Sequence, residues 1–390
     1  MKTRRYDLRA AVLSAPENQK TKPNAAMMLL FASPWNCLYS ARKLAEDPRF
    51  PERNVMGTGP FRFVRHVAGS EWIGERFDGY FRQGRPYLDG FRAVNMAPAA
   101  AVNAMTAGQV MTDFRGVTLQ ERDRIVATRG NAVRAGEVEQ PFYATLTFNT
   151  QKPPFDDARV RRALHIAVDR WTGADALARI FVLNGVSGLL RAGSPFAFTP
   201  DDLKKLPGFR PDMAANRAEA RRLLAEAGKS DLKIVLTNRP DYTPLGIFLI
   251  DQWRQIGVTA TQEQPENQRY FASLYGGNFD VIVDATQDYV DEPLMQFQSA
   301  PSFDINPNNR ARAIDRTIDE LYEAQTRATD LTRRMALVHE LESRLMNEAY
   351  RVPLFWSKRY TVMASELRGY EINTPSNLVG QDLADLWLAQ

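Results

Sequence analysis

Apolar and polar positions in the middle of the chain alternate between a helical period and a strand period. Asn216 and Glu219 form a capping-box pattern ahead of a helix predicted over 217–227, and Gly228 is suited to end that helix. Apolar residues at every second position of 232–236 then predict a strand. A helix followed by a strand is typical of an α/β protein.

The alternation continues along the next part of the chain. Pro244 is suited to open a second helix and Gly257 to end it. Its apolar stripe consists of Leu245, Phe248, Leu249, Trp253 and Ile256. A strand is predicted over 258–262, a short helix over 265–275 and an apolar strand over 279–284. Such a β-α-β-α-β order normally gives a parallel sheet flanked by helices.

Two more helices and two extended segments are predicted toward the carboxyl end. The helices lie between 314 and 348, and Asp330 is suited to cap the second of them. One apolar stripe consists of Ile314, Ile318 and Leu321, and the other of Leu331, Met335, Val338, Leu341 and Leu345. Core packing explains these stripes better than a zipper for a partner chain. Residues 352–356 and 360–364 are the extended segments.

Length, composition and charge narrow the class of protein. A chain of 390 residues predicts about two to three domains. Hydrophobic residues make up 44% and charged residues 25%, as in a folded globular protein. The 50 basic and 46 acidic residues are mixed along the chain, which argues against nucleic-acid binding. No stretch approaches the roughly 20 apolar residues that a membrane-spanning helix needs, so no membrane insertion is expected.

The sequence offers no assembled catalytic, metal or cofactor site. His66, His165 and His339 are isolated. Cys37 is the only cysteine, which excludes an intrachain disulfide and a cysteine-based zinc site. Gly185–Gly188 lacks the spacing of a nucleophile elbow. We therefore expect that the chain is not an enzyme and binds no cofactor or metal.

Two blocks of residues follow one another in an order that resembles a known family. The blocks are Gly57-Thr-Gly-Pro-Phe61 with Gly84-Arg-Pro-Tyr-Leu-Asp89, and the run from Phe148 through Leu164 with Ala167-Val-Asp-Arg170. They resemble the ABC transporter extracellular solute-binding proteins of family 5, which include dipeptide-, oligopeptide- and nickel-binding members. The agreement continues to Leu386–Trp387 and covers nearly the whole chain.

The resemblance implies an α/β fold of the periplasmic-binding-protein-like type II (cluster C), with two lobes around a ligand cleft. Residues 86–150 and 355–390 would form lobe I, and residues 151–354 lobe II. Residues 1–85 would be a remnant of a small extra domain and the lead-in to lobe I. Because the family's opening strands have no counterpart, we expect an N-terminally incomplete fold whose lobe I has an exposed sheet edge and tends to self-associate. The resemblance implies a periplasmic location, although Met1–Arg9 gives no convincing export signal.

In function, the resemblance implies the solute-binding component of an ABC importer. Such a component would capture a peptide or peptide-like solute in the cleft and dock on the ABC permease subunits. Two alternatives remain open. The chain could be a hydrolase that uses the same cleft, or a truncated relic without transport activity.

Five residues are predicted to contact the solute. Asp288 matches the aspartate that holds a peptide amino terminus in the family, and it follows a predicted strand at the end where ligands of open α/β sheets bind. Tyr289, Tyr143, Asn149 and Trp356 are predicted to line the cleft with aromatic surface and one amide. A solvated loop carboxylate is the alternative for Asp288, and core packing is the alternative for the other four.

Overall fold

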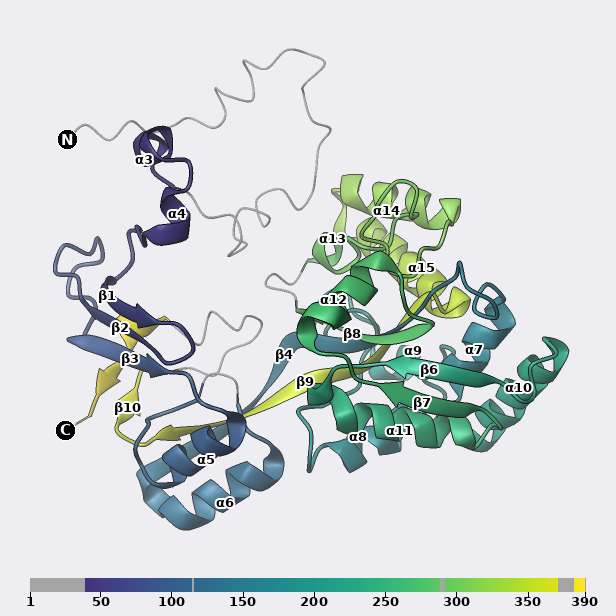
Figure 1. The fold of residues 1–390 in the computed structure, drawn as a ribbon, viewed down its shortest axis with the longest axis horizontal. Helices are drawn as coiled ribbons and strands as arrows, with labels where there is room; N and C mark the ends of the chain where they lie inside the picture. Colours follow the sequence, from purple (N-terminus) through teal and green to yellow (C-terminus); the bar gives the residue numbers. More distant parts are fainter. Residues whose placement is uncertain (1–38, 114–115, 288–291, 371–381, 390) are drawn as a thin grey trace.

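The computed structural model describes residues 39–113, 116–287, 292–370 and 382–389. The described residues form two bodies, which two long paired strands connect (Figure 1). No helix among these residues combines the length and the apolar character needed to cross a membrane. The larger body contains most of residues 151–350 and holds the candidate site.

The larger body is built on a six-stranded mixed sheet. Its strands, in spatial order, are β5 (Leu183–Gly185), β9 (Arg351–Ala364), β4 (Val133–Phe148), β8 (Val281–Gln287), β6 (Lys233–Thr237) and β7 (Thr259–Glu263). β6 pairs in parallel with β7 and with β8, which confirms the predicted parallel unit. β4 runs antiparallel to both of its neighbours, β8 and β9. The carboxyl ends of β6 and β8 therefore lie at one edge of the sheet.

The helix that precedes β6 starts earlier than the sequence pattern predicts. It is α10 (Met213–Glu226), and its N-cap is Asp212, whose side chain accepts a hydrogen bond from the Ala215 N–H at 3.0 Å. The predicted capping box of Asn216 and Glu219 is wrong because both residues lie inside the helix. Aspartate is as good a cap as asparagine, so the cap one turn upstream prevails.

Other predicted helix ends are confirmed. The crossover helices of the parallel unit are α11 (Thr243–Arg254) and α12 (Asn267–Gly276). Gly228, Gly257 and Gly277 follow α10, α11 and α12 with φ angles of 67°, 88° and 71°, a region that glycine enters without a steric penalty. Asp330 caps α15 (Leu331–Glu348) by accepting a backbone hydrogen bond in its first turn.

Helices cover both faces of the six-stranded sheet and bury apolar clusters on each side. One face carries α7 (Ala158–Ile166), α8 (Arg170–Leu177), α10 and α11, and the other carries α13 (Pro293–Gln296), α14 (Arg316–Arg327) and α15, with α9 (Pro200–Leu203) packed beside α15. Ile318 and Leu321 of α14 are buried as predicted. Ile314 is 58% exposed, so its predicted place in that stripe is wrong. It precedes the N-cap Asp315 and therefore lies outside the helix.

Strands β4 and β9 extend beyond the sheet into the second body (Figure 1). Residues 352–356 and 360–364, predicted as two segments, form one continuous strand because β9 pairs with β4 along its length. The second body contains α3 (Ala41–Glu46), α4 (Phe50–Arg53), β1 (Phe61–Val67), β2 (Glu71–Arg76), β3 (Gly90–Val94), α5 (Pro98–Thr106), α6 (Leu119–Arg129), β10 (Leu367–Arg368) and β11 (Trp387–Leu388). The predicted lobe boundaries fall just after β4 and inside β9.

Candidate functional site

The candidate site lies at the edge of the large sheet where β8 ends. Antiparallel pairing with β4 places Tyr143 opposite Thr286 and Thr145 opposite Asp284. After residue 292 the chain continues through α13 into α14 and α15, which lie on the same side of the sheet (Figure 1). Polar side chains from several distant parts of the sequence meet there.

Two of the predicted site residues contact each other at the junction of β4 and β9. The rings of Tyr143 and Trp356 stack with centroids 4.2 Å apart and an angle of 15° between their planes. Both side chains are buried, and the Trp356 indole N–H donates a hydrogen bond to the Gly188 carbonyl at 2.8 Å. The pair belongs to the apolar cluster beneath α14 and α15, so contact of its rings with a solute stays a prediction.

Arg351, the first residue of β9, is surrounded by hydroxyl groups. Its Nε donates to Thr145 Oγ1 at 3.3 Å, its Nη1 donates to Ser299 Oγ at 3.2 Å, and its Nη2 donates to Thr286 Oγ1. The guanidinium also lies 5.7 Å from the centre of the Tyr143 ring. We call Thr145, Thr286 and Ser299 the hydroxyl cluster. It fixes the orientation of the guanidinium, and none of the described residues forms an ion pair with it.

A second arginine at this edge has a carboxylate partner. Arg310 forms an ion pair with Asp284, whose side chain is only 4% exposed. Burial, reinforced by the charge of Asp284, raises the pKa of the nearby Tyr270, which donates its hydroxyl proton to the Val283 carbonyl at 2.6 Å. The Tyr270 hydroxyl therefore stays protonated and structural, and Asp284 is committed to Arg310.

A third arginine follows the end of β6. The Arg239 guanidinium lies over the Tyr242 ring at 4.6 Å from its centre and donates a hydrogen bond to the Tyr242 hydroxyl. Burial raises the pKa of Tyr242, so this hydroxyl is neutral at physiological pH. Asp241 also acts on the Tyr242 hydroxyl, so charges of both signs follow the end of β6.

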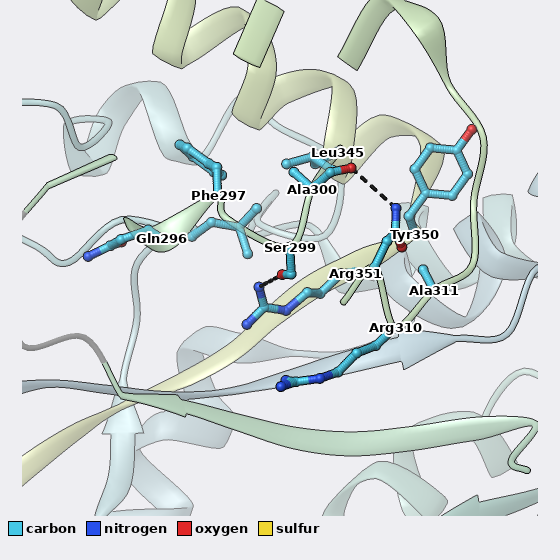
Figure 2. Close-up of a pocket in the computed structure, with 11 residues that line it drawn as sticks. Gln296, Phe297, Ser299, Ala300, Arg310, Ala311, Leu345, Tyr350 and Arg351 are labelled. Carbon is cyan, nitrogen blue, oxygen red and sulfur yellow. Dashed lines mark hydrogen bonds between the residues drawn. The ribbon is translucent and has the colours of Figure 1, made fainter. Parts of the chain in front are cut away.

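A recess opens beside Arg310 and Arg351 on the face of the sheet below α15 (Figure 2). We call it the arginine recess. Its volume is about 20 Å³, which is room for about one water molecule. It is lined by Leu189, Gln296, Phe297, Ser299, Ala300, Asn309, Arg310, Ala311, Leu345, Tyr350 and Arg351. Figure 2 shows the two arginine side chains running in the same direction below Ser299. No acidic residue belongs to the described lining.

The three other predicted site residues are Asp288, Tyr289 and Asn149. Asp288 and Tyr289 lie outside the described residues. Asn149 is buried, and its amide nitrogen donates to the carbonyls of Gly277 and Phe279 at 2.8 and 3.3 Å. These bonds tie the end of β4 to the turn that precedes β8. Contact between Asn149 and a solute stays a prediction.

Glu292, the N-cap of α13, has a structural role that the sequence did not indicate. Its buried carboxylate forms an ion pair with Arg334 of α15 and accepts a hydrogen bond from the Leu294 N–H at 3.1 Å. The pair fastens α13 to α15. Arg351 was missed as well, although a charged residue directly before the apolar run Val352–Trp356 is a signal that could have drawn notice.

Comparison with known proteins identifies the family. Residues 13–304 match the family model of bacterial extracellular solute-binding proteins, family 5 Middle. The dipeptide-binding protein of Pseudomonas aeruginosa is 24% identical over 344 residues, which are 84% of this chain and 61% of that protein. The periplasmic oligopeptide-binding protein OppA of Salmonella typhimurium is 24% identical over 336 residues, which are 83% of this chain and 59% of that protein. The chain thus spans about three fifths of the length of these relatives.

Solved structures agree in fold. DppA from Helicobacter pylori, in complex with the peptide STSA, superposes with a TM-score of 0.79 at 17% identity, covering 95% of this chain and 71% of that one. AppA from Bacillus subtilis, in complex with a nonapeptide, has a TM-score of 0.75 at 18% identity, covering 95% and 76%. These likenesses confirm the predicted α/β fold of type II periplasmic binding proteins. The relatives are solute-binding proteins, in agreement with the prediction that the chain is not an enzyme. The chain belongs to the bacterial extracellular solute-binding proteins of family 5.

Proposed function

We propose that the chain is the solute-binding component of an ABC importer and captures a peptide or peptide-like solute between two lobes. The observation that carries the proposal is family membership over residues 13–304 together with the two-bodied fold. The relatives quoted above are named as dipeptide- and oligopeptide-binding proteins, and both quoted structures hold peptides. A periplasmic location and docking on permease subunits are part of the same proposal.

The connection between the two bodies supports capture by closure. The long strands β4 and β9 are two of the segments that pass between the bodies. Their pairing is interrupted by register shifts between Glu139 and Tyr143 and again before Thr145. Fewer ladder hydrogen bonds at this point favour bending there, as in hinged binding proteins. The Tyr143–Trp356 stack lies at the same place.

Within this proposal Asp288 anchors a positively charged group of the solute, such as a peptide amino terminus. It follows β8 directly, at the edge where ligands of open α/β sheets bind. Tyr289, Tyr143, Asn149 and Trp356 are proposed to line the cleft.

A panel of di- to pentapeptides and opines, screened by thermal shift, tests the proposal. Each mixture is then analysed by mass spectrometry for cleaved products. We expect several peptides to raise the melting temperature and to be recovered intact. Cleaved peptides would instead support the hydrolase alternative. A folded chain that no member of the panel stabilises would support the relic alternative.

A further inference from the structure

His165 lies in the core of the larger body beside a positively charged side chain. It belongs to α7 and is 0% exposed, and its Nδ1 atom lies 3.0 Å from Nη2 of Arg170 in α8. Because a guanidinium only donates hydrogen bonds, Nδ1 accepts this bond and the ring proton lies on Nε2. The contact therefore requires the neutral form of His165.

Arg170 is held against the imidazole and stays charged. Its guanidinium is 1% exposed and donates to the carbonyls of Gly208 and Pro353 at 2.8 and 2.9 Å. Burial lowers the pKa of Arg170 to about 9, which leaves the group positively charged at neutral and acidic pH. The imidazole is packed so closely on Gly208 that a Cβ added there would clash with it. Neither side chain has room to turn away from the other.

The surroundings of the imidazole oppose a second positive charge. Burial, and after it the charge of Arg170, lowers the pKa of His165 well below its usual value of 6.5, and the Pro207 carbonyl offsets only part of that effect. Asp169, the N-cap of α8, acts on Arg170. Charged side chains on α7, α10 and α15 have partners of their own: Arg161 and Arg162 at Glu348, and Arg222 with Glu219 and Glu226. Within the described part of the chain, no carboxylate pairs with the imidazole.

We propose that His165 and Arg170 form an acid-sensitive latch that ties α7 and α8 to β9 and opens when His165 takes up a proton. The proton comes from solvent and bonds to Nδ1, so two cations replace the donor and the acceptor of the hydrogen bond. Their repulsion pulls Arg170 from the Pro353 carbonyl, which lies in β9 between Arg351 and Trp356 of the candidate site. Acidification therefore loosens the larger body at that site, whatever solute it binds.

Urea unfolding at several pH values tests the latch in the parent chain, in His165→Gln and in the control His66→Gln. Glutamine can accept the bond from Arg170 but takes up no proton, and His66 is exposed on β1. The unfolded chain binds the proton more readily than the folded one, so the stability contributed by neutral His165 is complete above pH 6.5 and is lost as the pH falls below it. Relative to His165→Gln, the unfolding equilibrium constant of the parent should rise by up to about tenfold per pH unit. His66→Gln should follow the parent.

Two measurements separate the latch from a purely structural role of His165. At any one pH, the ratio of amide exchange rates in β9, parent over His165→Gln, should increase as the pH is lowered. Nitrogen NMR of the parent alone covers a His165→Gln chain that does not fold: in the folded parent, Nδ1 of His165 should carry no proton at about pH 6. A constant exchange ratio, an equal pH dependence of unfolding in the parent and His165→Gln, or a proton on Nδ1 would overturn the proposal.

Discussion

The phenol ring of Tyr143 stacks on the indole of Trp356, which joins strands β4 and β9 where their pairing shifts register. Each ring belongs to the apolar cluster between the sheet and α14 and α15. The same Tyr143 ring lies 5.7 Å from the Arg351 guanidinium. The stack is therefore part of the core and also part of the surroundings of the arginine recess.

Trp356→Phe tests how much the core depends on this stack. Phenylalanine keeps an aromatic ring but removes the N–H that donates to the Gly188 carbonyl. We expect the free energy of unfolding, measured in urea, to fall by about 1–3 kcal/mol. Trp387→Phe, at a site 45% exposed, is the control and should change it by less than about 0.5 kcal/mol. Ligand-dependent fluorescence that persists unchanged in Trp356→Phe would remove Trp356 from the cleft wall.

Arg170 fastens α8 to three other segments from inside the core. It is 1% exposed and donates to the carbonyls of His165, Gly208 and Pro353 at 3.2, 2.8 and 2.9 Å. Lysine cannot reach these acceptors together because its single ammonium lacks the planar fork. Arg170→Lys should lower the free energy of unfolding by about 2–4 kcal/mol, whereas the exposed Arg179→Lys should have almost no effect. Equal free energies of unfolding for the parent and Arg170→Lys would show that these hydrogen bonds are dispensable.

Glu342 of α15 makes the free energy of unfolding depend on pH. Burial raises the pKa of Glu342 from 4.5 to about 8, although its carboxylate accepts a hydrogen bond from the Leu189 N–H. The unfolded chain ionises at the lower value, so the stability contributed by protonated Glu342 is complete below pH 4.5 and is lost as the pH rises to about 8.

Glu342→Gln should abolish that loss because the amide keeps the acceptor and carries no charge. Between pH 4.5 and about 8, the free energy of unfolding of the variant should rise relative to that of the parent. The rise should be at most about 1.4 kcal/mol per pH unit. Urea unfolding at several pH values measures the difference. Glu340→Gln, an exposed neighbour, is the control and should follow the parent. A difference between Glu342→Gln and the parent that stays constant with pH would contradict the burial effect.

The buried ion pair between Glu292 and Arg334 should be the main link between α13 and α15. Their side chains are 2% and 8% exposed. Glu292→Gln leaves the arginine buried without its counter-charge, so the free energy of unfolding should fall by about 3–5 kcal/mol. The exposed pair of Glu323 and Arg327 provides the control, and Glu323→Gln should cost about 0.5 kcal/mol or less. Similar losses in the two variants would contradict the special role of the buried pair.

Features set by neighbouring residues could be predicted from the sequence. The parallel unit of β6, β7 and β8, the stop at Gly228 and the Asp330 cap each depend on a few consecutive positions. Errors arose where several local choices compete. Asp212 caps α10 in place of Asn216, because both residue types accept the same backbone hydrogen bond.

The site depends on contacts that no local pattern contains. Arg351 is held by hydroxyls from residues 145, 286 and 299, which are brought together only when β4, β8 and β9 pair and the chain returns after α13. Tyr143 and Trp356 were predicted as aromatic residues of the cleft, but their mutual stacking follows from the register of β4 and β9. Long-range register cannot be derived from the period of one strand.

Isothermal titration calorimetry of the chain with the most stabilising peptide of the screen measures solute capture directly. We expect one peptide to bind per chain, with a dissociation constant in the micromolar range, and to be recovered intact. Asp288→Asn should weaken that binding at least about tenfold, because it removes the proposed partner of the peptide's amino terminus. A folded chain that gives no binding heat with any peptide, or that returns cleaved peptide, would contradict solute capture.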